Sequence, residues 1–501
     1  MIGALEGQCG GGGSVAAAER LDKACPRCDE AGGRDKGSGS MMDMRGKVVS
    51  GRFLHAPTQG GVEILGEALV DVDASGTIRA VTKTADPQHA RLAAEAARED
   101  RLVVLPPKTA MLPGFVDLHI HAPQYPQLGK ALDVPLEVWL QRYTFPLEAR
   151  YADLAFARKS YEALVGDLLA GGTTTALYFA TVHQEATRLL AEICLEKGQR
   201  ALVGKVAMDH PEACPPYYRD ASARAAIEGT AALIDHLATL PGNDGLVMAV
   251  ATPRFIPACT DALLEGLGAL VKSCGCHVQT HCSESDWEHG AVKARYGATD
   301  AEMLDRFGLL TRRTILAHSN FLTPADMDRV AARGAGVAHC PLSNAYFANA
   351  VFPLRAALAK GVRVGLGTDI SGGPSASMLE VQRMAIAASR MLEGGVDPDI
   401  EAERRGRPGA RIDVPLAFHL ATAGGADALD LPVGSFAAGR QFDAILVDPE
   451  APGSTMRLFD EVDEEADLLE KIVYTASRPN LAAVFVAGRA VSGSNRDRLT
   501  A

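Results

Sequence analysis

The middle of the chain alternates between short runs of apolar and β-branched residues and longer segments in which apolar positions have helical spacing. Such runs predict β-strands, and the segments between them, for example 154–172 and 185–200, predict amphipathic helices. Strands that alternate with helices form parallel βαβ units, and eight such units close into a TIM-type (β/α)8 barrel. We count eight strand runs, at 115–121, 173–181, 200–209, 245–255, 277–284, 314–320, 334–341 and 363–370.

Both ends of the chain carry a different pattern, in which polar and apolar residues alternate and turn residues are frequent. This pattern predicts β-strands, and we expect residues 46–110 and 433–495 to build one small β-sandwich domain beside a barrel domain at 111–432. Residues 1–45 are rich in Gly, Ala and Ser, which predicts a disordered tail. A CPRC motif at Cys25 to Cys28 lies in this tail without a second cysteine pair, so no zinc ribbon is expected there.

The composition excludes several classes of function. Of the 501 residues, 47% are hydrophobic and 22% are charged, which is typical of a globular protein with a large core. The net charge of -12 and the lack of basic stripes give no reason to expect binding to nucleic acid or to an anionic membrane surface. No apolar stretch approaches the roughly 20 residues of a membrane span, and no secretory signal is visible. We therefore expect a cytoplasmic enzyme whose scattered cysteines are reduced.

Histidines gather at the carboxyl ends of the predicted strands. The chain has 13 histidines, and five of them follow this pattern, which chance placement does not explain. Barrel enzymes place their catalytic residues at this face, so the pattern predicts an active site there. The polar residues at the strand ends are His119, His121, Arg254, His281, Glu284, His318, His339 and Asp369.

Four of these residues suit a divalent metal ion. His119 and His121 lie two positions apart on one strand, so both imidazoles point to the same side. His281 and Asp369, at the ends of two other strands, complete a set of three imidazoles and one carboxylate, which suits zinc. Strand four ends in Arg254 and not in a lysine that could bridge two metals. We therefore expect one zinc ion per chain, with an open coordination position for water.

Several motifs together resemble a known family of metal-dependent hydrolases. The segment from about Lys47 to Val491 is similar to the amidohydrolase superfamily and, within it, to the guanine deaminases. HAPQY, YTFPLE and TPRF carry the guanine-deaminase resemblance, whereas THCSE, LAHSNFL, AHCPLSN and GLGTDISGG are shared more widely. Leu118 departs from the small polar residue that often precedes the histidine pair. The resemblance implies a zinc-dependent, homodimeric enzyme of purine catabolism or salvage that hydrolyses guanine to xanthine and ammonia.

Residue type and resemblance together give each strand-end residue an expected role. Asp369 is expected to take a proton from the zinc-bound water, and His318 to orient that water or stabilise the oxyanion. Glu284 is expected to carry protons to the ring and to the leaving amine. His339 is expected to orient Asp369 or Glu284. The expected zinc ligands are His119, His121, His281 and Asp369.

Three residues are expected to bind the substrate. Arg254 offers only N–H donors, which suit the O6 and N7 acceptors of guanine and would oppose the amino group of adenine; the alternative is a salt bridge under the barrel rim. Gln124 can both donate and accept toward the remaining ring edge, and Phe255 can stack on the ring. Trp139 and Tyr143, four residues apart, either roof the pocket or pack in the core.

Two other interpretations stay open from the sequence. A related aminohydrolase that acts on cytosine, an adenosine-type thioether or a triazine would use the same metal site, although Arg254 with Gln124 favours guanine. A non-catalytic scaffold would tolerate the loss of metal ligands. The presence of the whole ligand set and of Glu284 argues against that second interpretation.

Overall fold

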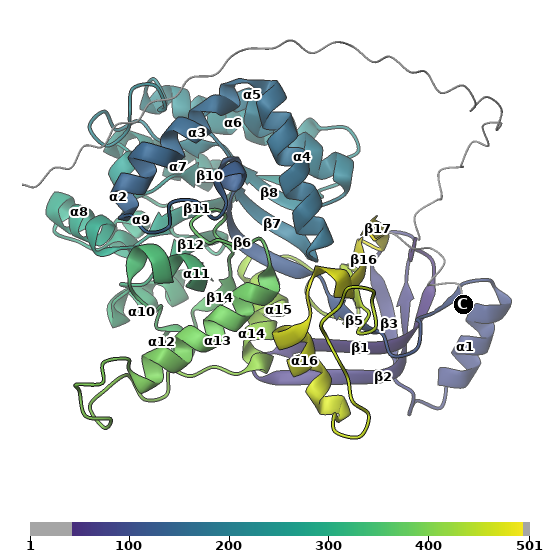
Figure 1. Ribbon diagram of the computed structural model, residues 1–501. Helices are drawn as coiled ribbons and strands as arrows, with labels where there is room; N and C mark the ends of the chain where they lie inside the picture. Colours follow the sequence, from purple (N-terminus) through teal and green to yellow (C-terminus); the bar gives the residue numbers. More distant parts are fainter. Residues whose placement is uncertain (1–42, 494–501) are drawn as a thin grey trace, which may run out of the picture. The chain divides into compact units, whose positions relative to one another are not determined.

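The computed structural model describes residues 43–493, and a barrel of parallel strands lies in the middle of them (Figure 1). The hydrogen-bonded order of its strands is β14-β13-β12-β11-β10-β8-β7-β6, and the short β9 (Val206–Ala207) pairs with β10. All eight strands lie within the predicted runs, so the predicted TIM-type barrel is confirmed. Their bounds are β6 Phe115–His121, β7 Thr173–Phe179, β8 Arg200–Gly204, β10 Val247–Pro253, β11 His277–Cys282, β12 Thr314–His318, β13 Gly336–His339 and β14 Arg363–Leu366.

The first and last strands of the barrel meet through hydrogen bonds that lie beyond the end of β14. The backbone N–H of Asp369 donates to the carbonyl of His119 at 2.9 Å, and that of His121 donates to the carbonyl of Ile370 at 2.8 Å. These bonds bring the end of β6 beside the loop that follows β14. Residues more than 240 positions apart in the chain therefore share one edge of the barrel mouth.

Helices follow the strands and cover the outside of the barrel (Figure 1). Local sequence sets their ends, as α10 illustrates: Thr323 and Asp326 form a capping box, Pro324 occupies the first turn, and Gly334 ends the helix with φ 67°. The bounds of the barrel helices are α4 Leu154–Ala170, α5 Gln184–Lys197, α6 Ala223–Thr239, α7 Asp261–Cys274, α8 Asp286–Tyr296, α9 Asp300–Arg306, α10 Pro324–Arg333, α12 Leu354–Ala359, α13 Met378–Gly394, α14 Val414–Ala421 and α15 Ala423–Ala428.

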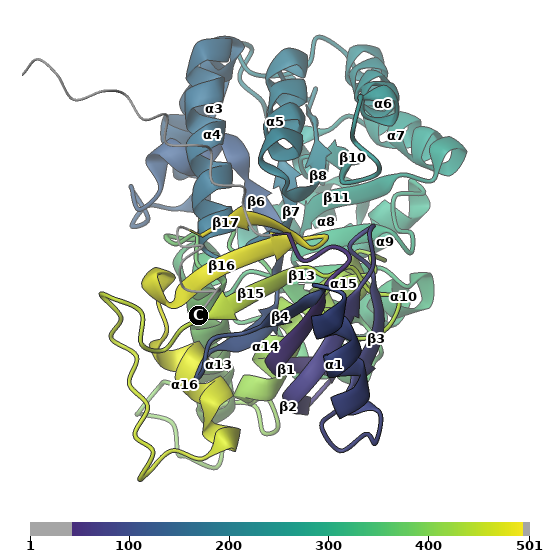
Figure 2. The same cartoon turned by 90° about the vertical axis from the view of Figure 1, so that its right-hand side faces the viewer.

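The two ends of the chain build a second sheet, as predicted. Its order is β17-β16-β15-β5-β1-β2-β3, and β4 pairs with β1 beside this path, so the predicted sandwich is one hydrogen-bonded sheet of eight strands. Antiparallel pairing of β5 with β15 joins the two chain ends, and in Figure 2 the yellow β15 and β16 lie on one side of this sheet and the purple β1 and β2 on the other. The bounds are β1 Val48–Thr58, β2 Gly61–Val72, β3 Ile78–Thr82, β4 Leu102–Val104, β5 Ala110–Pro113, β15 Ala444–Val447, β16 Leu481–Val486 and β17 Arg489–Ser492.

The second sheet has its own apolar core and is accompanied by two helices, α1 (His89–Arg98) and α16 (Leu468–Thr475). The rings of Phe53 and Phe436 meet edge to face at 5.0 Å, and Phe442 and Phe485 pack in the same fully buried cluster. Buried aromatic rings contribute large apolar areas to a core. Contacts between the two ends of the chain therefore stabilise this sheet.

The predicted disordered tail lies outside the described residues except at its end. Residues 43–45 are ordered, because Asp43 forms a β-bridge with Arg489 and Met44 is fully buried. All seven cysteines within residues 43–493 are free thiols. In this part of the chain we find no helix with the length and apolar character needed to cross a membrane.

Candidate metal centre and active site

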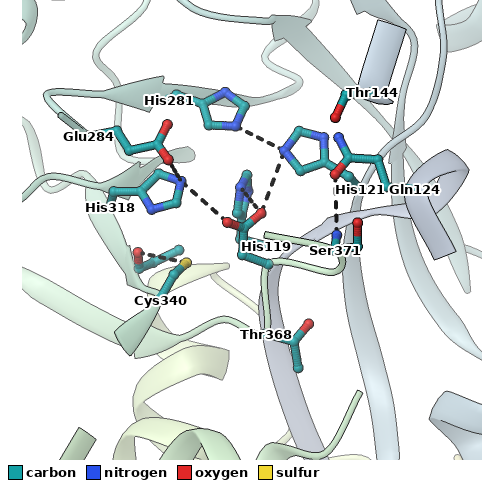
Figure 3. Close-up of polar contacts among 12 residues, drawn as sticks. His119, His121, Gln124, Thr144, His281, Glu284, His318, Cys340, Thr368 and Ser371 are labelled. Atoms are coloured by element: carbon teal, nitrogen blue, oxygen red, sulfur yellow. Dashed lines mark hydrogen bonds and ion pairs between the residues drawn. The ribbon is translucent and has the colours of Figure 1, made fainter. Parts of the chain in front are cut away.

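Four of the five strand-end histidines, His119, His121, His281 and His318, converge at one place in the barrel mouth (Figure 3). The two Nε2 atoms of His121 and His281 are 2.9 Å apart, and Nε2 of His119 lies 3.2 Å from Oδ1 of Asp369. Nε2 of His121 lies 3.7 Å from the same carboxylate oxygen. The ligand atoms of the three histidines all lie within 4.8 Å of one another. The structure therefore brings together all four residues that the sequence suggested as metal ligands.

The hydrogen bonds of the cluster leave imidazole lone pairs facing its centre. Nδ1 of His281 lies 2.6 Å from the carbonyl oxygen of Arg254, and a carbonyl only accepts, so the proton of His281 is on Nδ1. The lone pair of its Nε2 consequently points toward His121. Nε2 of His119 is buried and has no hydrogen-bond partner within residues 43–493. A divalent cation would satisfy these nitrogens, so the donor set fits a metal ion of the zinc type.

Burial keeps the cluster in the protonation states that a metal requires. Removal from water lowers the pKa of His119, His121 and His281 well below the ordinary value for histidine, and neighbouring positive groups lower it further. The imidazoles are therefore neutral and able to bind a metal. Burial also raises the pKa of Asp369, while the neighbouring His318 acts in the opposite direction.

Asp117 connects the two sides of the cluster. Its carboxylate accepts hydrogen bonds from the hydroxyl of Thr368 at 2.6 Å, the backbone N–H of Thr368 at 3.0 Å and the backbone N–H of His119 at 3.2 Å. Burial raises the pKa of Asp117 to about 7, although these three bonds oppose the shift. His119 lies on β6, and Thr368 directly precedes Asp369 in the loop after β14. Asp117 therefore holds β6 and the Asp369 loop at a fixed distance.

A chain of side-chain amides connects His318 to the backbone of Glu284. Asn320 donates from Nδ2 to the carbonyl of Glu284 at 2.9 Å, and its Oδ1 accepts from Nδ2 of Asn344 at 2.8 Å. Oδ1 of Asn344 lies 3.0 Å from Nδ1 of His318. Since the carbonyl at the end can only accept, every amide orientation is determined and His318 donates from Nδ1. Nε2 of His318 then faces Oε1 of Glu284 at 3.7 Å and Oδ2 of Asp369 at 3.8 Å.

Glu284 lies just after β11, beside the histidine cluster (Figure 3). Burial, together with the nearby carboxylate of Asp369, raises the pKa of Glu284 well above the ordinary value for a glutamate. Its backbone N–H donates to the carboxylate of Glu288 at 2.7 Å, so side chains bind both its N–H and its carbonyl. Glu284 is therefore held firmly, and its raised pKa favours the protonated form that can donate a proton.

A pocket of about 460 Å³ opens onto this cluster. Gln124, Arg254 and Phe255, the three residues expected to bind substrate, all line it together with Glu284. The remaining lining residues are His121, Leu136, Trp139, Leu140, His281, Trp287, Glu288, Ser343, Phe347, Asp369 and Gly372.

Comparisons with known proteins agree with this geometry. A sequence model of the Amidohydrolase family matches residues 110–491. A probable guanine deaminase of Schizosaccharomyces pombe is 39% identical over 452 residues, which are 89% of this chain and 83% of that protein. The chain belongs to the amidohydrolase family. In this amidohydrolase, the three buried histidines and Asp369 form a metal-binding cluster.

Solved structures of two deaminases share the fold. A guanine deaminase from C. acetobutylicum with guanine in its active site superposes with a TM-score of 0.78 at 29% identity, covering 89% of this chain and 100% of that one. An adenosine deaminase from Xanthomonas campestris with bound zinc superposes with a TM-score of 0.73 at 26% identity, covering 89% and 92% of the two chains.

The sequence did not point to several residues that line the pocket or lie behind it. Glu148 is fully buried and forms an ion pair with Arg254, but the sequence shows it only as a glutamate within YTFPLE. Trp287 and Phe347 line the pocket from α8 and from the turn after β13. No periodic pattern distinguishes these positions from ordinary surface or core residues. The YTFPLE motif was the one available pointer to Glu148.

Two further predictions concern residues near the pocket, one for Trp139 and Tyr143 and one for His339. Trp139 lines the pocket, whereas Tyr143 packs beside Trp139 and Phe347 in an apolar cluster and does not line it. His339 lies against the ring of Phe352 at 5.5 Å, and its buried Nδ1 has no hydrogen-bond partner within residues 43–493. Among the described residues no hydrogen bond joins His339 to Asp369 or Glu284, and the expectation that it orients one of them stays a prediction.

Proposed function

We propose that the protein is a zinc-dependent guanine deaminase that hydrolyses guanine to xanthine and ammonia. The observation that carries the proposal is the position of Arg254 and Gln124 in a pocket that opens onto the buried metal-binding cluster. Arg254 presents donors to guanine O6 and N7, and adenine would present an amino donor instead. The relatives of this chain include proteins named guanine deaminase, one of them with guanine bound.

In the proposed reaction, the metal ligands are His119, His121, His281 and Asp369, with one zinc ion per chain. Zinc bound there supplies a water ligand whose pKa lies near 7, so that the nucleophile is available at neutral pH. Asp369, beside His119 and His121, would accept a proton from the attacking water. His318, held with its proton on Nδ1, turns Nε2 toward the attacking side and orients the nucleophile.

Glu284 handles the protons on the substrate. Its raised pKa lets it hold a proton, which it gives to the ring nitrogen beside C2 as the water oxygen bonds to that carbon. The carboxylate then takes the proton that the new C2 hydroxyl group loses and passes it to the amino nitrogen, so that C2=O forms, the C–N bond breaks and ammonia leaves; the proton held by Asp369 restores the acid form of Glu284. Phe255 lines the pocket, with its ring centre 6.3 Å from that of His281. In this position it packs against the purine ring of the substrate.

A substrate panel with metal analysis tests the proposal. The purified protein should contain about one zinc per chain and release ammonia from guanine far faster than from cytosine, an adenosine-type thioether or a chlorotriazine. Chelation should abolish the activity and added zinc should restore it. Zinc-loaded protein that leaves guanine unchanged would overturn the proposal, and rapid turnover of another ring would replace the substrate.

We also propose that the enzyme is a homodimer in the cytoplasm, as the family resemblance implies. Size-exclusion chromatography with light scattering checks the dimer through the measured mass of the particle. Cell fractionation followed by the ammonia assay checks the location.

A further inference from the structure

Glu148, on the short helix α3 (Phe145–Ala149), contacts two of the three residues proposed to bind guanine, Gln124 and Arg254. Its Oε2 accepts a hydrogen bond from Nη1 of Arg254 at 2.7 Å, and its Oε1 accepts from Nη2 of Arg254 at 3.1 Å. The same Oε1 accepts from Nε2 of Gln124 at 2.8 Å. The carboxylate is fully buried and does not line the pocket, so it acts on the substrate only through these two neighbours.

These bonds determine which atoms Gln124 presents to the pocket. A carboxylate can only accept, so the amide nitrogen of Gln124 faces Glu148. On the other side, the backbone N–H of Ser371 can only donate, and it donates to Oε1 of Gln124 at 3.2 Å. The amide is therefore held in one orientation from both ends (Figure 3 shows the bond to Ser371). One N–H and one lone pair of Gln124 remain for a ligand.

Glu148 determines the remaining donors and the charge of Arg254 as well. Two of the five guanidinium N–H groups are bound to the carboxylate, which leaves three for the substrate and other partners. Arg254 is 2% exposed, and its guanidinium carbon lies 5.0 Å from the ring centre of Phe145. In this apolar setting, the charge of Glu148 balances that of Arg254 at short range.

Charge balance matters because substrate and product differ in acidity. Guanine is neutral in mildly alkaline solution, whereas xanthine, with an N–H between two carbonyls, is a stronger acid and is largely an anion there. A neutral Arg254–Glu148 pair gives the anion no electrostatic advantage over guanine. An Arg254 without its carboxylate would attract the anion strongly in a site shielded from water.

We propose that Glu148 is a positioning residue that determines specificity: it orients Gln124 and Arg254 for guanine and keeps the pocket from favouring the anionic product. This inference rests on the proposed function. It assigns to Glu148 two separable effects, one through geometry and one through charge, so two substitutions can distinguish them.

The test compares Glu148→Gln with Glu148→Asp in mildly alkaline buffer. Glu148→Gln removes the charge, so KM for guanine should rise about tenfold while the inhibition constant of xanthine falls. Glu148→Asp keeps the charge but shortens the side chain, so KM should rise without tighter binding of xanthine. Glu137→Gln, on the exposed face of the neighbouring helix α2 (Leu136–Trp139), is the matched control and should change neither constant.

Each outcome decides the inference. Equal weakening of guanine and xanthine in Glu148→Gln would show a purely structural role and overturn it, as would wild-type constants in that variant. If Glu148→Gln does not fold, the double variant Glu148→Gln/Arg254→Met removes both charges and should bind guanine poorly without tighter xanthine binding; tighter xanthine binding there would refute the charge argument. A wild-type enzyme inactive on guanine would defeat the proposed function itself, and this inference with it.

Discussion

At the scale of single residues, the chemistry depends on side chains that fix the proton positions of others. His318 can act on the nucleophile only if its Nε2 faces the metal cluster and its proton is on Nδ1. The amides of Asn344 and Asn320 determine that state, because their hydrogen bonds run in one direction to the carbonyl of Glu284. The same series of hydrogen bonds couples the position of His318 to that of Glu284. Neither asparagine needs to touch the substrate to affect the rate.

We predict that Asn344→Asp lowers kcat about 10- to 100-fold, which is typical when a partner of an active-site histidine is changed. The carboxylate still accepts from His318 but cannot donate to Asn320, so the chain to Glu284 breaks. Zinc content and KM for guanine should change little. Asn349→Asp makes the same chemical change at an exposed position five residues later and serves as the control. Equal kcat values in the two variants, measured by ammonia release, would contradict this role.

Residues that carry chemistry by themselves were predictable, and residues that act through others were not. His119, His121, His281 and Asp369 stand at strand ends, where the strand pattern and the residue type coincide. Asn320 and Asn344 also follow strands, but an amide near a turn has many structural explanations. Glu148 is 106 positions from Arg254, and only the folded chain reveals that they pair.

At the scale of elements, the barrel strands were predictable because β-branched runs repeat at regular spacing. The segment between β6 and α4 was not, because it consists of turns of three to six residues, too short for a helical period to show. The closure between β6 and the loop after β14 was also invisible in the sequence. It depends on the buried carboxylate of Asp117 and on Thr368, which are 251 positions apart.

We predict that Thr368→Val weakens zinc binding about tenfold. The substitution removes the 2.6 Å hydrogen bond to Asp117 and so loosens the distance between His119 and Asp369. Thr173→Val is the matched control, since the hydroxyl of Thr173 is buried in β7 without a hydrogen-bond partner in the described part of the chain. Competition with a coloured chelator measures both affinities. If the two variants bind zinc equally well, the link between Asp117 and Thr368 does not position the ligands.

At the scale of the whole molecule, the second sheet and the barrel are joined by a buried ion pair. Arg200, at the start of β8, donates from Nε to Oδ2 of Asp443 at 3.0 Å and from Nη2 to Oδ1 at 3.2 Å. Asp443 also accepts from the backbone N–H of Ala487 at 2.7 Å. A second ion pair, between Lys108 and Glu450 at 2.8 Å, connects the N-terminal and C-terminal parts of the chain and is exposed to solvent.

These two pairs should differ sharply in their effect on stability. Asp443→Asn preserves the size of the side chain but leaves the charge of Arg200 buried without a partner, so the free energy of unfolding should fall by about 3–5 kcal/mol. Glu450→Gln should cause no measurable loss, because water screens and solvates both of its charges. Urea denaturation with saturating zinc measures both variants in the same folded state. A small loss in Asp443→Asn would mean that water reaches Arg200, and the junction between sheet and barrel would then depend mainly on apolar packing and on the β5–β15 ladder.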